Sequence, residues 1–256
     1  MEGFYRRIEV WKHTEQNAPA KSMESTKYTW DSGFKPIAKY NDMKTVVVKG
    51  DLIDTGKAFL KYNPVVLNLA DDSFPGGCVY TGSNAAEESL FRRTNYFRTL
   101  IMNFYPIKNE EAVYSPAVTV FKHGDEHDYI ECPPYQMCFI ACPGLRHPII
   151  TEDGKMKEAD VAILEKKIEL ILQIAAKNSH EVVVLGALGC GAWKNPPHDV
   201  ASAFKRVLDK WQGVFRAVVF AIKENVESGY VTRLDSQRAD NYSTFKHVLE
   251  DRYNEI

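Results

Sequence analysis

Two adjacent glutamates, Glu87 and Glu88, are the side chains in this sequence best suited to act on a bound substrate. They follow a turn-rich segment, residues 71–78 (DDSFPGGC), which contains two consecutive glycines. Carboxylates placed beside a loop that holds phosphate can serve as general acid and base. The same pair could instead only stabilise the positive end of a helix, because acidic side chains favour a helix N-terminus. The two residues alone leave both interpretations open.

The elements on either side of this first glycine loop predict how it is held. The preceding run, Val65–Ala70, is apolar and predicts a buried strand that ends at the loop. Residues 75–77 (PGG) allow backbone torsions closed to other residues and let N–H groups approach a ligand. A helix is expected next, with Ser83 or Asn84 as its N-cap and Glu87 in the capping-box position. Strand, glycine loop and helix start together favour an anion site built from backbone amides.

A second glycine-rich loop follows another predicted strand. The strand is Val182–Leu185, and the loop is Gly186–Trp193 (GALGCGAW), whose small residues leave room for a diphosphate. Trp193 could cover a sugar or a base, or could belong to the core. In open α/β sheets, ligands lie at the carboxyl ends of the strands. A ligand held by both loops would therefore be rich in phosphate and resemble a nucleotide.

Strands and helices alternate in the rest of the sequence, which predicts an α/β fold. The clearest helix is Lys157–Lys177, where apolar residues fall on one face. Residues 20–41 predict a long loop or extended arm, and residues 114–116 (YSP) a break. We expect one domain over residues 1–256, with residues 1–43 as an N-terminal accessory segment. Further strands are expected at Thr45–Val48, Ala117–Phe121, Gln136–Ala141 and Phe215–Ile222, and helices at Gly3–Ala18, Asp54–Lys61, Ser89–Arg98, Val200–Leu208 and Asp240–Tyr253.

The composition excludes several classes of protein. Hydrophobic residues make up 45% of the chain and the formal net charge is −2, which argues against direct nucleic-acid binding. No apolar run approaches the roughly 18 residues of a membrane span, and the N-terminus lacks a signal-peptide core. Five cysteines, an odd number, do not make a disulfide framework in a chain of this length, and the spacing of Cys132, Cys138 and Cys142 is not that of a zinc site. We expect a soluble monomer of a reducing compartment, cytoplasm or nucleus, without membrane partner, metal or cofactor.

These motifs resemble those of the macrodomain-type poly(ADP-ribose) glycohydrolases, in particular the microbial-type branch. The signature of that branch is a three-glycine run, then six to eight residues, then Gln-Glu-Glu. Here Gly76-Gly77-Cys78 is followed by seven residues and then by Ala86-Glu87-Glu88. The other motifs that resemble the family, in the same order along the chain, are residues 49–52 (KGDL), 66–70 (VLNLA), 114–116 (YSP) and 186–193 (GALGCGAW).

The resemblance implies a three-layer α/β/α macrodomain-like sandwich with a mixed central sheet and an extra N-terminal segment. It also implies ADP-ribose as ligand and hydrolysis at the distal ribose anomeric carbon of poly(ADP-ribose) or protein-linked ADP-ribose. Glu88 would be the catalytic acid, Glu87 would orient the ribose, and Asp51 would accept from the adenine amine. The residues expected to bind ADP-ribose are Asp51, Leu52, Asn68, Asp71, Gly76, Gly77, Cys78, Val79, Gly189, Cys190, Gly191, Ala192 and Trp193.

Two positions depart from the family signature. Cys78 replaces the third glycine, which would cost on the order of 1 kcal/mol or more if the position needs a positive φ. Its side chain would also narrow the pocket for the distal ribose. Ala86 replaces the glutamine and removes a polar side chain. Two alternatives to a glycohydrolase stay open: a protein that binds ADP-ribose without turnover, and a hydrolase of another nucleotide metabolite such as an acylated ADP-ribose.

Overall fold

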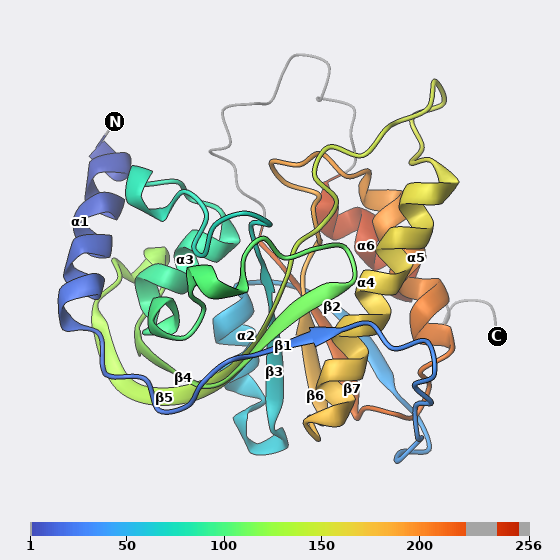
Figure 1. Cartoon of the computed structure of the whole chain (residues 1–256), viewed down its shortest axis with the longest axis horizontal. Coiled ribbons are helices and arrows are strands. Elements are labelled where there is room, and N and C mark those ends of the chain that lie inside the picture. The colour runs from blue at the N-terminus through green and yellow to red at the C-terminus, as the bar shows by residue number, and fades with distance from the viewer. Residues whose placement is uncertain (1, 224–239, 251–256) are drawn as a thin grey trace.

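Seven strands form one mixed sheet with helices on both of its faces (Figure 1). The structure, a computed structural model, describes residues 2–223 and 240–250. In the sheet order β1-β4-β5-β3-β6-β7-β2, the strands from β5 to β2 are parallel, and β4 and β1 are antiparallel to their neighbours. The predicted three-layer class is confirmed. The strands are β1 (Thr26–Thr29), β2 (Lys44–Lys49), β3 (Pro64–Leu69), β4 (Glu111–Lys122), β5 (Glu131–Cys142), β6 (Val182–Leu185) and β7 (Ala217–Ile222).

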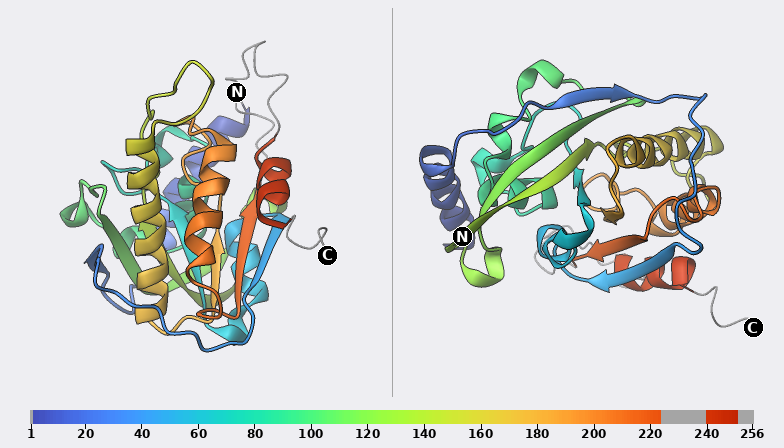
Figure 2. Two further views of the ribbon diagram at one scale, coloured as in Figure 1. Left: turned by 90° about the vertical axis from the view of Figure 1, so that its right-hand side faces the viewer. Right: turned by 90° about the horizontal axis from the view of Figure 1, so that it is seen from below.

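Six α-helices in the described part of the chain build the two outer layers. Figure 2 shows α4, α5 and α6 side by side on one face of the sheet, where α4 packs on β4 and β5 and α6 packs on β2. On the other face α2 and α3 pack on the central strands, and α1 packs on α3. The helices are α1 (Glu2–Asn17), α2 (Leu52–Ala58), α3 (Ala86–Arg93), α4 (Glu158–Lys177), α5 (Pro197–Asp209) and α6 (Asn241–Glu250).

The central strand β3 shows how the sequence produces these layers. Val65, Val66 and Leu67 are all at most 1% exposed, as expected for a parallel strand covered on both faces. Alternate side chains of a strand point to opposite faces. Accordingly, Val65 and Leu67 join the core beneath α4 and α5, whereas Val66 joins the core beneath α2 and α3. Burial on both faces therefore fixes the position of β3, and the first glycine loop follows at its carboxyl end.

One prediction about the strands is wrong. The segment 114–116 does not break the chain, because β4 runs through it with a bulge between Ser115 and Val118, where Ala117 has a φ of 53°. A bulge lets a strand carry a proline while the ladder continues on either side. The predicted arm at residues 20–41 is largely irregular and adds one short strand, Thr26–Thr29, which pairs with β4.

The predicted starts of two helices are also wrong. Asp51, not Asp54, caps α2, and its carboxylate accepts hydrogen bonds from two backbone N–H groups in the first turn. The N-cap of α3 is Ala85, which has no side-chain oxygen, so neither Ser83 nor Asn84 caps this helix. Glu87 and Glu88 lie in its first turn.

The ends of two helices also differ from the prediction. Helix α3 ends at Arg93 instead of residue 98, because Thr94 is extended and forms a β-bridge with Val120. The last helix, α6, is confirmed up to Glu250, and the remainder of that prediction lies outside the described residues. No helix in residues 2–223 or 240–250 is long and apolar enough to cross a membrane.

Candidate active site

Glu87 is buried and bonded through both carboxylate oxygens. The residue is 3% exposed. Asn68, at the end of β3, donates from Nδ2 to Oε1 at 3.0 Å, and the backbone N–H of Asp71 donates to Oε2 at 2.7 Å. Burial raises the pKa of Glu87 to about 8 against the opposing effect of these hydrogen bonds. At pH 7 this side chain therefore carries a proton, although it stands in a helix start that favours negative charge.

Glu88 is held through one oxygen and leaves the other uncommitted. The backbone N–H of Cys78 donates to its Oε1 at 3.0 Å, and the residue is 5% exposed. Among the residues that the structure describes, none forms a hydrogen bond with its second oxygen, Oε2. A carboxyl group fixed by one bond and free at its other oxygen has the arrangement that a general acid and base needs.

Two features require glycine in the first loop: neighbouring side chains approach its backbone closely, and its φ angles are positive. Gly77 has a φ of 53°, and a Cβ there would lie 3.0 Å from Glu88 Oε1 and 3.3 Å from Glu87 Oε2. Gly76 has a φ of 80°, and a Cβ there would lie 2.5 Å from the ring of Phe91. Both positions are left-handed, where side chains other than hydrogen are strained. The loop can thus pack against α3 and reach both carboxylates only with these two glycines.

Cys78 fits the third position of the signature without strain. Its φ is −98°, so the position does not need a positive φ and the conditional cost of a cysteine there does not arise. The reason is that the positive φ values fall on Gly76 and Gly77, and the chain has turned by the time it reaches Cys78. Partial burial, then the nearby Glu88 carboxylate, raise the pKa of the Cys78 thiol. The thiol is accordingly protonated at neutral pH and is not a strong nucleophile.

The second glycine loop is held in place by a buried amide, Asn195, which is 1% exposed. Its Nδ2 donates to the carbonyl of Gly189 at 3.0 Å and to that of Leu145 at 2.6 Å. Gly189 has a φ of 74°, and a Cβ there would lie 2.7 Å from Asn195. Gly191 and Ala192 at the tip are exposed. This loop therefore presents its backbone to solvent from a fixed base.

Arg146 connects the two glycine loops. From the segment after β5 it forms ion pairs with Asp71 and Asp72 in the first loop, at 2.9 Å and 2.6 Å. Its guanidinium also stacks over Trp193 in the second loop, with Cζ 4.5 Å from the ring centroid. The Arg146 guanidinium holds the pKa of Asp72 below its ordinary value. Trp193 is half-buried in this contact and is not a core residue.

Asp51 and Leu52, at the carboxyl end of β2, form the third part of this region beside the two glycine loops, here called the Asp51 corner. Besides capping α2, the Asp51 carboxylate accepts a hydrogen bond from Arg93 at 2.6 Å. Arg93 is 1% exposed, comes from the end of α3 and also pairs with Asp54 at 2.6 Å. Leu52 is 6% exposed and lies against Gly186 at the base of the second loop. The helix with the glutamates is thus tied directly to the Asp51 corner.

The predicted site residues divide into two groups in the structure. The loops, both glutamates and Asp71 line one edge of the sheet, at the ends of β3 and β6. Asn68 and Val79, by contrast, are 0% exposed, and Asn68 gives its amide to Glu87. Sequence reasoning missed three residues that organise the site: Arg93, Arg146 and Asn195. Arg146 could have been found from the sequence, because it follows the predicted strand Gln136–Ala141, and ligands lie at the carboxyl ends of strands in open α/β sheets.

A comparison with protein families found a match over the part of the chain that contains the first glycine loop and both glutamates. Residues 2–123 match the family described as microbial-type PARG, catalytic domain, where PARG denotes poly(ADP-ribose) glycohydrolase. This part of the chain, 122 of the 256 residues, is similar to that family. The matched region contains the first glycine loop, both glutamates and the Asp51 corner, whereas the second glycine loop lies beyond it. A comparison with curated proteins found no match.

Solved structures of PARG resemble the whole chain. A PARG from Thermomonospora curvata has 20% sequence identity and a TM-score of 0.78, over 96% of this chain and 99% of that one. The PARG from the same organism bound to the inhibitor ADP-HPD gives 20% and 0.75, over 96% and 98%. A Deinococcus radiodurans PARG in complex with ADP-ribose gives 20% and 0.66, over 98% and 92%. At this identity the similarity establishes the fold, and the predicted macrodomain-like architecture is confirmed.

Proposed function

We propose that this protein is an ADP-ribosyl glycohydrolase that releases ADP-ribose from poly(ADP-ribose) or from ADP-ribosylated protein. One observation carries the proposal: Glu88 is fixed by the Cys78 N–H through one oxygen and is uncommitted at the other, beside a loop that only glycine can form. The family match of residues 2–123 supports it, as do the PARG structures with ADP-ribose and ADP-HPD bound.

In the proposed binding mode the two glycine loops hold the diphosphate of ADP-ribose on backbone N–H groups. Asp51 and Leu52 would lie at the adenine end, because they stand on the β2 side of the sheet. Gly76–Val79 would surround the distal ribose, next to both glutamates. Asp71 would reach this ribose with its side chain, whereas Asn68 would act on it through Glu87, to which it is bonded.

In the proposed reaction the bond between the anomeric carbon and the leaving oxygen breaks, and Glu88 gives its proton to that oxygen. Water then adds to the anomeric carbon and returns a proton to Glu88, so the products are ADP-ribose and the hydroxyl form of the leaving group. Glycoside cleavage passes through an oxocarbenium-like state. The diphosphate of the bound substrate would stabilise that cation in place of a second carboxylate.

Glu87 is the other candidate for the acid, since it carries a proton at pH 7. Both of its oxygens are engaged, by Asn68 and by Asp71, which favours a role in orienting the ribose. Because its pKa is raised to about 8, it also remains neutral beside Glu88 through the neutral range.

The raised pKa of Glu87 predicts a pH dependence of stability. The native state binds this proton with a pKa of about 8, against 4.5 for the ordinary carboxyl, so native protein holds more protons between these values. Stability should then fall as pH rises through this window, by up to about 1.4 kcal/mol per pH unit. Urea unfolding of wild type and Glu87→Gln at several pH values measures it. The amide in this variant cannot ionise, and its altered hydrogen bonds add only an offset that is independent of pH.

The difference in stability between the two proteins should therefore change with pH. The wild type should lose free energy of unfolding relative to Glu87→Gln as pH rises, and the difference should level off above pH 8. Parallel curves over the whole window would show that Glu87 ionises normally in the folded protein.

Incubation with poly(ADP-ribose), and separately with protein carrying single ADP-ribose units, tests the proposed function. Free ADP-ribose, separated by chromatography, is the expected product of at least one substrate. Tight ADP-ribose binding with neither substrate consumed would instead identify a binding protein without turnover. Release of ADP-ribose only from acylated ADP-ribose would identify the third function considered above.

A further inference from the structure

Arg146 follows a short segment that is fixed to the base of the second glycine loop. The segment leaves β5 beside the end of β3, where the first loop begins. Asn195 of the second loop donates to the carbonyl of Leu145 at 2.6 Å, and a Cβ on Gly144 would lie 2.7 Å from the Cα of Gly189. The backbone before Arg146 is thus held by the second loop, while its side chain reaches the first.

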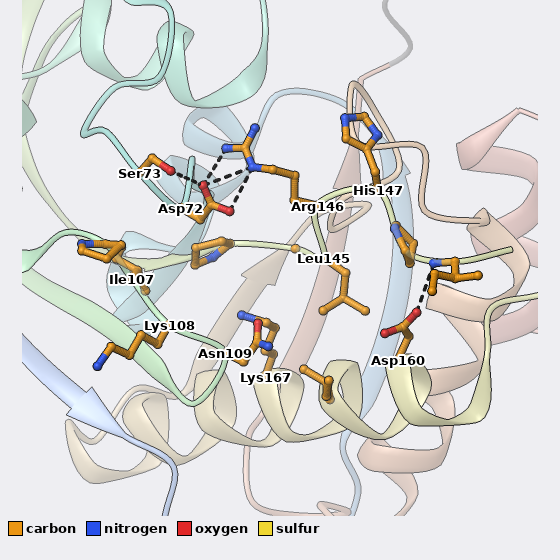
Figure 3. Close-up of a pocket in the computed structure, with 16 residues that line it drawn as sticks. Asp72, Ser73, Ile107, Lys108, Asn109, Leu145, Arg146, His147, Asp160 and Lys167 are labelled. Carbon is orange, nitrogen blue, oxygen red and sulfur yellow. Dashed lines mark hydrogen bonds and ion pairs between the residues drawn. The ribbon is translucent and has the colours of Figure 1, made fainter.

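The guanidinium of Arg146 uses only part of its hydrogen-bonding capacity. Nε and Nη2 form a two-pronged fork on Asp72, at 3.0 Å to Oδ2 and 2.6 Å to Oδ1, and Nη2 also donates to Asp71 at 2.9 Å. A guanidinium has five N–H donors, so the two on Nη1 are left. No group in residues 2–223 or 240–250 accepts a hydrogen bond from Nη1. Figure 3 shows the fork, with the third nitrogen turned away from Asp72.

The surroundings of the guanidinium fix its orientation but leave it accessible. One edge is held by Asp72, and Trp193 of the second loop lies against the guanidinium, with Cζ 4.5 Å from the ring centroid. The Arg146 side chain is nevertheless 43% exposed. A planar fork held in this way loses little conformational freedom when it forms one more bond. The Nη1 edge is therefore oriented in advance for an acceptor that arrives from solvent.

The charges at the first loop also require a cation if an anion is to bind there. Asp71 and Asp72 are two carboxylates beside the glycines of this loop, and they would repel a diphosphate. Within the described part of the chain, Arg146 is the only cation that forms an ion pair with either of them. It contacts both loops, so a diphosphate held between the loops would lie next to its guanidinium.

We infer that Arg146 is a further binding residue for ADP-ribose, in which Nη1 donates to an oxygen of the diphosphate while Asp72 and Trp193 keep the guanidinium in place. The inference rests on the proposed function and adds a charged side chain to its backbone amides. The diphosphate is present before and after the glycosidic bond breaks. The contact therefore lowers KM and leaves kcat nearly unchanged.

The substitution Arg146→Met tests this role, with Arg216→Met as matched control. Arg216 is also an exposed arginine that pairs with a carboxylate, Glu181 at 3.0 Å, and stacks on an aromatic ring, that of Tyr62 at 4.7 Å. It precedes β7 and so lies at the edge of the sheet opposite the glycine loops. Both variants should stay folded, because the carboxylates left behind are partly exposed, and thermal unfolding checks this.

Calorimetry with ADP-ribose and with ADP, which lacks the distal ribose, measures affinity without turnover. Arg146→Met should weaken binding of both ligands by the same factor, about tenfold, the usual loss for a hydrogen bond between charged groups. KM for poly(ADP-ribose) should rise in parallel, with kcat within about twofold of wild type. Arg146→Lys keeps the charge but not the fork, so it should recover only part of the affinity. All values for Arg216→Met should stay within about twofold of wild type.

Unchanged affinity in Arg146→Met would overturn the inference, and tighter binding would show that Arg146 obstructs the site instead. A larger loss for ADP-ribose than for ADP, with a lower kcat, would also overturn it, since Arg146 would then only shape the first loop around the distal ribose. Full recovery in Arg146→Lys would overturn the oriented contact. A wild type that binds ADP-ribose through Arg146 but hydrolyses neither substrate would overturn the proposed function alone. A wild type that does not bind ADP-ribose would overturn both.

Discussion

Glu88→Gln is expected to lower kcat by roughly 10²–10⁴-fold, the contribution of a positioned general acid and base. Glutamine keeps an oxygen that can accept from the Cys78 N–H, so the side chain should stay in place. It cannot give a proton to the leaving oxygen or take one from water. Affinity for ADP-ribose should change little, because the two glycine loops would bind the diphosphate without this group.

Release of ADP-ribose from the polymer gives kcat, and calorimetry with ADP-ribose gives the affinity. Glu9→Gln is the control, since Glu9 is an exposed glutamate of α1 that pairs only with Lys12 in the described part of the chain. It should match the wild type in both measurements. A Glu88→Gln variant with wild-type kcat would remove Glu88 from the mechanism.

Arg93→Met is expected to lower the free energy of unfolding by about 3 kcal/mol or more, as for other buried ion pairs that lose one partner. Arg93 is 1% exposed and bonds two carboxylates of the α2 start, Asp51 and Asp54, each at 2.6 Å. Without it, the 16%-exposed side chain of Asp51 would keep a charge with little solvent around it. Urea unfolding measures the loss.

The matched control is Arg6→Met, which breaks an exposed arginine–aspartate pair with Asp128. Exposed pairs contribute about 0–1 kcal/mol. The two variants should therefore differ by about 2 kcal/mol or more. Similar small losses in both would show that Asp51 and Asp54 are adequately solvated without Arg93.

Much of the fold could be predicted because its signals are local. The strand Val182–Leu185 has the predicted bounds, and the helix predicted at Lys157–Lys177 begins at residue 158. A short apolar run and a periodic apolar face are visible within one window of sequence. The two glycine loops and the two glutamates were also found this way, and the structure brings Gly77 and both carboxylates together.

The remaining features of the site depend on contacts between distant segments. Arg93 meets Asp51 across 42 positions, and Arg146 meets Asp71 across 75. No window of sequence contains both partners, so an arginine at either position looks like an ordinary surface charge. The sequence left the conformation of Cys78 open for a related reason. The two left-handed residues of the loop, Gly76 and Gly77, lie where Phe91 and the two carboxylates of α3 approach the backbone. Their positions are therefore set by the packing of α3 on the loop, which the local sequence does not show.

A crystal structure of the protein with ADP-ribose would test the central claim most directly. We expect a diphosphate between Gly76–Val79 and Gly189–Trp193, with Glu88 Oε2 within about 3 Å of the anomeric hydroxyl of the distal ribose or of one intervening water. The adenine should lie toward Asp51. An ADP-ribose bound elsewhere, or a distal ribose turned away from Glu88, would contradict this expectation.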